Sequence, residues 1–112
     1  MIVEVRTYRV KPGRRAEFIA FFESRSIPAL QDEGMTVLGP LLDLEDPDVF
    51  VWLRGFPSLE ARERMKSAFY EGPLWLNELE AIAMPMLESY GSVLAETTNG
   101  FVGALASASS RA

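Results

Sequence analysis

The sequence predicts a single α+β domain of the ferredoxin-like type, in which helices cover one face of a four-stranded antiparallel sheet. Two observations carry this prediction. The chain has 112 residues, a length that supports one hydrophobic core and not two. Segments that alternate like strands and segments with the apolar spacing of helices follow one another in the order β-α-β-β-α-(α)-β, which is the split βαβ pattern.

Four segments are predicted to be strands, because they are rich in apolar, β-branched and aromatic residues and are bounded by turn residues. They are residues 2–10, 35–44, 49–56 and 88–97. The third has the strongest strand signal. Gly39-Pro40 within the second indicates an edge strand or a bulge, because proline lacks the N–H that a central strand must donate.

The first predicted helix covers residues 14–33. Its apolar residues fall on one stripe. Pro28 is expected to bend or split it near Ser26, because proline cannot donate the helical hydrogen bond. Gly34 is expected to close it in the left-handed conformation that glycine tolerates.

Two further helices are predicted between the third and fourth strands. The first covers residues 59–69 and has Ser58 as its N-cap. Gly72-Pro73 then interrupts the chain and opens the next helix, which Pro85 should end. Residues 1–98 are therefore expected to form the folded domain.

The last segment, residues 99–112, is rich in Ala, Ser and Gly and carries one charge. This composition is typical of a flexible tail. The alternative is an arm that docks on a partner subunit.

The composition excludes several classes of function. There is no histidine and no cysteine, so zinc fingers, thiol nucleophiles and histidine general bases are absent. No dinucleotide-binding or P-loop motif is present, and the acidic turn at residues 45–48 lacks the spacing of a calcium loop. We therefore expect no metal and no cofactor.

The charge and hydropathy of the chain also limit its partners and location. The net charge is −5, which argues against nucleic acid and anionic membranes as partners. No run of about 18 apolar residues occurs, so no membrane span is expected. The first residues lack the apolar core of a signal peptide, and we expect a cytoplasmic location.

Alternation divides each strand into two faces. We expect one set to pack under the helices, namely Val3, Val5, Thr7, Val49, Val51 and Leu53. The other set is then expected on the open face of the sheet, namely Ile2, Glu4, Arg6, Tyr8, Phe50, Trp52, Arg54 and Phe56. Aromatic residues concentrated in one patch indicate an interface or a pocket. We therefore expect two sheets to pair face to face as a homodimer with a cleft between them.

The predicted cleft contains the candidate site. Arginine keeps its charge, so Arg6 and Arg54 must meet either Glu4 or an anionic ligand. Without His or Cys, acid–base chemistry would fall to carboxylate or tyrosine side chains, and the candidate catalytic residues are Glu4, Tyr8 and Arg54. The candidate ligand-binding residues are Arg6, Phe50, Trp52, Phe56, Trp75 and Tyr90. Trp75 also fits an ordinary place in the core, because it lies on a helical apolar stripe.

Several short blocks resemble the bacterial branch of the NIPSNAP family. They are Glu4-Val5-Arg6-Thr7-Tyr8, Lys11-Pro12-Gly13, Phe50 to Phe56, Ala61-Arg62, Ala68-Phe69-Tyr70, Gly72-Pro73 and Trp75. The resemblance implies membership of the dimeric α/β-barrel superfamily, and so a ferredoxin-like protomer and a homodimer. It does not imply a reaction, because the superfamily includes cofactor-free monooxygenases, cyclases and dehydratases, haem enzymes and members of unknown activity. Residues 77–84 differ from the family's polar stretch, since the family's His is absent and apolar residues replace its Arg and Asn.

Three functions fit these observations. The first is a small enzyme acting on an apolar, carbonyl-bearing or anionic molecule, such as a cofactor-independent oxygenase, cyclase or isomerase. The second is a non-catalytic binder of a similar molecule. The third is an interaction module whose open face only dimerises. We favour binding or catalysis on a small molecule at the sheet face.

Overall fold

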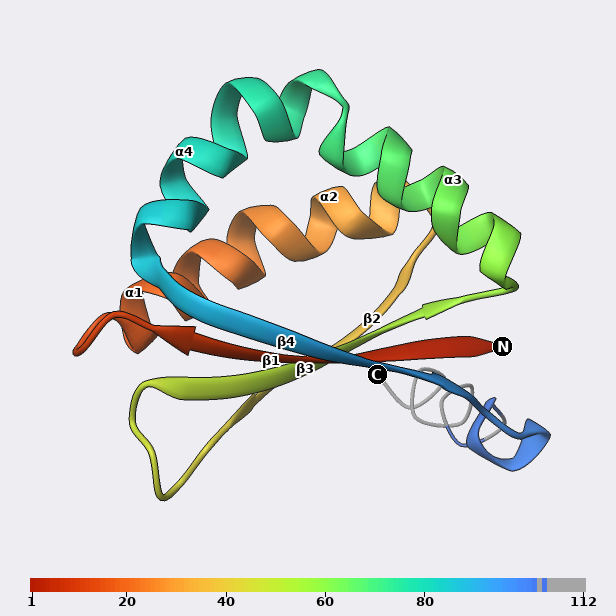
Figure 1. Cartoon of the computed structure of the whole chain (residues 1–112), viewed down its shortest axis with the longest axis horizontal. Helices are drawn as coiled ribbons and strands as arrows, with labels where there is room; N and C mark the ends of the chain where they lie inside the picture. The colour runs from red at the N-terminus through yellow and green to blue at the C-terminus, as the bar shows by residue number, and fades with distance from the viewer. Residues whose placement is uncertain (103, 105–112) are drawn as a thin grey trace.

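The computed structural model describes residues 1–102 and 104, and it confirms the ferredoxin-like α+β fold. The sheet has four antiparallel strands in the order β2-β3-β1-β4. These strands are β1 (Ile2–Val10), β2 (Thr36–Leu42), β3 (Val49–Phe56) and β4 (Leu87–Glu96). Figure 1 shows that helices α1 to α4 all lie on one side of this sheet.

The first helical segment is continuous, with one wider turn in its middle. It comprises α1 (Arg15–Phe21), the π-helical turn η1 (Phe22–Ser26) and α2 (Ile27–Asp32). The irregular turn ends at Ser26, as the sequence predicted, because Pro28 near the start of α2 has no N–H to continue the regular pattern. Gly34 follows at φ 90°, the left-handed conformation expected at the helix end.

The second helical segment begins with α3 (Leu59–Tyr70). The Ser58 side chain accepts a hydrogen bond from the Ala61 N–H at 3.1 Å, which confirms it as the N-cap. After Gly72 the chain continues as η2 (Trp75–Leu79), α4 (Glu80–Ala83) and the 3₁₀ turn η3 (Met84–Met86). A Cβ at Gly72 would lie 2.5 Å from the Ala68 carbonyl oxygen, so only glycine fits this turn.

The two faces of the sheet are the reverse of the prediction. Phe22 of η1 lies 5.8 Å from Phe50 and 5.0 Å from Trp52 between ring centroids. The placement of the aromatic set on the open face was therefore wrong, and this applies to Glu4, Arg6, Tyr8, Phe50, Trp52, Arg54 and Phe56 alike. Alternation separates two sets of side chains, but it does not identify the set that faces the helices. The large rings lie inside because they fill the space beneath helices that themselves carry phenylalanines.

The open face is aliphatic instead. One row of register partners crosses all four strands and consists of Leu38, Leu53, Val5 and Val93. The adjacent row consists of Leu41, Val51, Thr7 and Gly91. Val93 is 64% exposed and Leu41 is 59% exposed, so the face is not covered by the helices of its own chain.

Strand β2 has the edge position and the irregular pairing predicted for it. Among the described strands it pairs only with β3, and the register shifts between Leu38 and Leu41, on either side of the Gly39-Pro40 pair. The Gly39-Pro40 peptide bond is cis.

After β4 the chain begins a helical turn at residues 99–102. The predicted tail covers residues 99–112, and its residues 103 and 105–112 lie outside the described residues. Within the described part of the chain, no helix combines the length and the hydropathy that a bilayer span requires.

Candidate functional site

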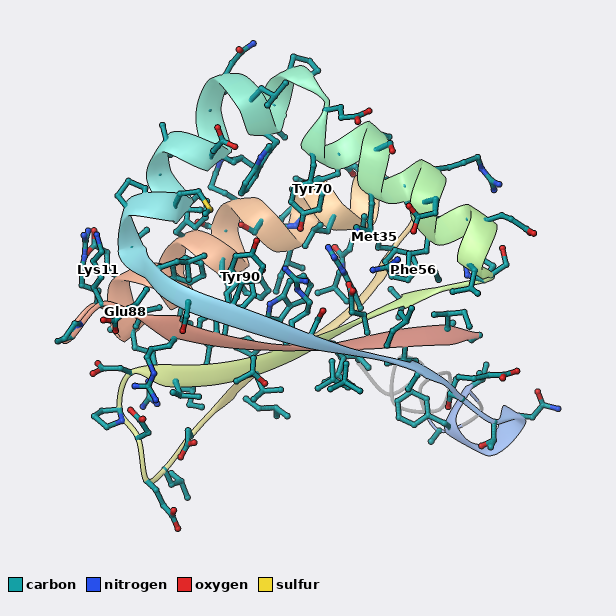
Figure 2. The ribbon with its side chains drawn as sticks, in the orientation of Figure 1. Lys11, Met35, Phe56, Tyr70, Glu88 and Tyr90 are labelled. Carbon is teal, nitrogen blue, oxygen red and sulfur yellow. The ribbon has the colours of Figure 1, made fainter. Side chains whose placement is uncertain are left out.

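A cavity of about 410 Å³ lies between the helices and the sheet. The sheet contributes Arg6, Tyr8, Trp52, Arg54 and Tyr90 to its wall. The two helical segments contribute mainly aromatic and aliphatic residues, and their polar residues in the wall are Ser26, Lys66, Tyr70 and Glu80. Figure 2 shows Tyr70 and Tyr90 in the space between β4 and the helices. A mostly apolar cavity with a few convergent polar groups is the usual form of a small-molecule site.

A buried ion pair lies beside this cavity. The carboxylate of Glu4 accepts hydrogen bonds from Arg54 Nε through Oε1 and from Arg62 Nη2, at 2.7 Å, through Oε2. Burial by itself raises the pKa of Glu4, but the hydrogen bonds and charges of Arg62 and Arg54 outweigh it and hold the pKa below its ordinary value. Both carboxylate oxygens are therefore engaged, and Glu4 is an ionised structural group rather than a free base.

Arg6 is the other arginine on this face of the sheet, and it is bonded differently. Its Nη2 donates to the Tyr8 hydroxyl at 3.2 Å, while its buried Nε has no hydrogen-bond partner in the described part of the chain. Its guanidinium lies 5.2 Å from the Tyr90 ring centroid and 6.0 Å from that of Trp52. Within residues 1–102 and 104, Arg6 forms no ion pair. The wall of the cavity thus contains a cation without a carboxylate partner.

Two tyrosine hydroxyls complete the polar wall. The Tyr8 hydroxyl accepts from Arg6, and the Tyr70 hydroxyl accepts from Arg54 Nη1 at 2.9 Å. Burial raises the pKa of Tyr8, although the charge of Arg6 acts in the opposite direction. Tyr8 is therefore a protonated phenol at neutral pH. A hydroxyl that accepts one hydrogen bond keeps its own proton for donation, so both phenols can donate to a ligand.

The structure brings together six of the nine residues predicted for the site. Arg6, Tyr8, Trp52, Arg54, Trp75 and Tyr90 line the cavity. Glu4, Phe50 and Phe56 are buried on the same side of the sheet, but the cavity wall does not include them. Trp75 is half-buried and donates from Nε1 to Glu80 at 3.1 Å, so it serves both the packing and the wall.

Sequence reasoning missed the contribution of α3. Arg62, Lys66 and Tyr70 were not among the predicted site residues, yet Arg62 binds Glu4 while Lys66 and Tyr70 line the cavity. A signal for this was present, since the three residues are spaced four apart and therefore share one helical face.

The described residues offer no metal centre. Across residues 1–102 and 104, no three His, Cys, Asp or Glu side chains are grouped so that they could hold a metal ion. In the acidic turn, Asp46 binds Arg9 at 2.8 Å and Asp48 accepts from the Gly13 N–H at 3.1 Å. These two carboxylates join the turn to the end of β1 and the residues that follow it.

Comparison with known proteins identifies the family. The family model named NIPSNAP matches residues 3–95. The chain belongs to the NIPSNAP family. The resemblance seen in the sequence is thereby confirmed, and no curated protein sequence matches significantly.

Several solved structures share the fold of this NIPSNAP chain. A NIPSNAP domain protein of Burkholderia xenovorans is 21% identical, with a TM-score of 0.77 and coverage of 88% of this chain and 96% of that one. A protein of Agrobacterium tumefaciens is 23% identical, also with a TM-score of 0.77, and covers 88% of this chain and 95% of its own. A protein described as an antibiotic biosynthesis monooxygenase is 14% identical, with a TM-score of 0.63 and coverage of 88% and 99%. At these identities the likeness concerns the fold alone.

Proposed function

We propose that this NIPSNAP protein binds a small, mostly apolar or aromatic molecule in the cavity between the helices and the sheet. The observation that carries the proposal is the cavity of about 410 Å³, which combines an aromatic wall with a small polar group around Arg6. This volume lies within the range of about 300–1,000 Å³ that is usual for ligand sites. The site belongs to the helix side of the sheet, not to the open face on which it was first expected.

The protein is further proposed to act as a homodimer that pairs through the open face of its sheet. The aliphatic row that contains Leu53 and Val93 supports this, because a large exposed apolar face usually marks a site of protein association. The dimer leaves the cavity accessible, since the cavity lies on the other side of the sheet. The cytoplasmic location expected from the sequence stays a prediction.

Binding is the first candidate and catalysis the second. Glu4 has both oxygens engaged, so the carboxylate first considered as a base is occupied. The phenols of Tyr8 and Tyr70 favour the second candidate, because donors aimed at a carbonyl oxygen would stabilise an enolate. That role fits an isomerase, a cyclase or a cofactor-independent oxygenase, and the fold of the antibiotic biosynthesis monooxygenase described above is compatible with the last of these.

Filling the cavity tests the proposed site. Ala83 is buried and lines the cavity, so Ala83→Phe should occupy part of it and abolish retention of a ligand. Ala81 lies two residues earlier on α4 and is exposed, so Ala81→Phe is a matched control. We expect native mass spectrometry to detect a releasable mass on the wild type and on the control, but not on Ala83→Phe. If Ala83→Phe retains the mass as the control does, the ligand lies elsewhere and the proposal is overturned.

The same comparison needs a check of folding. Circular dichroism and the thermal midpoint of Ala83→Phe should show a folded protein. If that variant fails to fold, Ser26→Phe is the second test, because Ser26 is buried in the first helical segment and lines the same cavity.

A further inference from the structure

Arg6 and Trp52 are register partners on β1 and β3, and each has a buried N–H group without an acceptor among the residues that the structure describes. These groups are the Nε of Arg6 and the Nε1 of Trp52, and both residues line the cavity. A buried donor without an acceptor is costly, so such groups are rarely left unused. Two such groups on paired residues of one cavity wall favour a ligand that supplies the acceptors.

The neighbouring hydroxyls are donors as well. Tyr8 accepts from Arg6 and Tyr70 accepts from Arg54, so each phenol has its own proton available for a ligand. The residues of the cavity wall therefore include two N–H groups and two O–H groups with hydrogens to donate. An ionised carboxylate carries acceptors only, and it is the head group that matches such a set.

The charge around the cavity matches one negative charge. Arg54 and Arg62 share the Glu4 carboxylate, and Arg62 also pairs with Glu63, so these four charges balance. Lys66 and Glu80, which have opposite charges, both line the cavity. Among the described residues, Arg6 is then the cation without a carboxylate partner. A monoanion restores neutrality, whereas a phosphate dianion would bring a second charge that this wall does not balance.

The remaining wall defines the rest of the ligand. Apart from these polar groups it is formed by aromatic and aliphatic side chains, among them Phe18, Phe22, Leu30, Phe69 and Leu87. We propose that the ligand of this cavity is an aromatic or apolar monocarboxylate whose carboxylate is bound by Arg6 together with Trp52 Nε1 and the Tyr8 hydroxyl. This inference rests on the small-molecule site proposed above and names its ligand class.

Matched acids and amides test this inference. The probes are benzoate, phenylacetate, 3-phenylpropanoate, cinnamate and 1-naphthoate, each compared by calorimetry with its primary amide at up to millimolar concentration. At least one acid should bind at least about tenfold more tightly than its amide, because the amide lacks the charge that pairs with Arg6. Arg6→Met should remove most of this preference, because it weakens the charged acid more than the neutral amide. Arg9→Met is the control, since Arg9 is exposed on the same strand and pairs with Asp46.

Trp52→Phe provides a second variant, which keeps an aromatic ring and removes the N–H group together with part of the indole. It should weaken the acid by about three- to tenfold and the amide by less, because a hydrogen bond to a charged acceptor is the stronger of the two. Amides that bind as tightly as the acids would overturn the carboxylate inference and leave the proposed small-molecule site standing. Binding of no member of either series to the wild type would overturn both.

Discussion

Glu4 and Arg54 are register partners on β1 and β3, and their side chains form an ion pair that is buried beneath the helices. Arg62 of α3 binds the second oxygen of the same carboxylate, which ties this helix to the sheet. Arg6 lies two residues from Glu4 on the same face of β1 and has no such partner within the described residues. The two arginines of this face therefore differ in their contacts, since Arg54 is bound to Glu4 and Arg6 is the residue proposed above to bind the ligand.

Loss of Arg54 should destabilise the protein strongly. Arg54 is 1% exposed, so Arg54→Leu leaves the Glu4 carboxylate buried with one of its two arginines missing. We expect the free energy of unfolding in urea to fall by about 3–5 kcal/mol. Arg25→Leu is the control, because Arg25 and Glu78 form an exposed pair whose loss should have little effect. Equal stability of the two variants would contradict the structural role of Arg54.

Loss of Arg6 should have the opposite effect on stability. Arg6→Leu removes a partly buried charge that has no carboxylate partner within residues 1–102 and 104, and it places an apolar side chain on an aromatic wall. The free energy of unfolding in the absence of ligand should rise by about 1 kcal/mol, as is common where a binding residue is replaced. Urea unfolding measured beside Arg54→Leu checks this, and a loss of several kcal/mol would show that Arg6 is structural.

Acid should lower the folding stability of the protein, because it protonates Glu4. The pKa of Glu4 lies below its ordinary value of 4.5, so the folded state favours the ionised form. The resulting stability is present above the unfolded pKa and is lost as the pH falls through the lower folded pKa. Urea midpoints measured from neutral pH to about pH 3 should therefore fall at the acid end. Glu4→Gln should flatten this fall, whereas Glu23→Gln, a change at an exposed helical position, should retain it.

A charge on the open face should prevent dimerisation. Leu53 lies at the centre of the aliphatic row between Val5 and Leu38, so Leu53→Glu places an unpaired carboxylate in the proposed interface. Sedimentation velocity should then detect a folded monomer in place of a dimer. Leu76→Glu, at an exposed position of the second helical segment, should remain dimeric. A Leu53→Glu protein that stays dimeric would exclude pairing through this face.

The order of the elements could be predicted from sequence because the signals involved are local. The Ser58 cap, the left-handed Gly34 and the irregular turn before Pro28 each depend on a few neighbouring residues. The strand boundaries followed for the same reason, since alternation and turn residues act over a few positions.

Part of the candidate site could also be predicted, since Arg6, Tyr8, Trp52 and Arg54 were grouped correctly on one face. Their grouping follows from the period of a strand. The side of the sheet that they occupy did not follow, because exchanging the two faces leaves the alternation unchanged. The large rings of Phe18 and Phe22 decided it by requiring equally large partners beneath them.

The sequence by itself determined the ferredoxin-like order of elements, the family, and the absence of histidine and cysteine chemistry. Only the tertiary structure decided which arginine is paired and which is free. Glu4 meets partners that are 50 and 58 residues away in the chain, Arg54 and Arg62, and no local pattern encodes such a meeting. The cavity arises in the same way, because it exists only where helices packed against the sheet leave Arg6 without a carboxylate among the described residues.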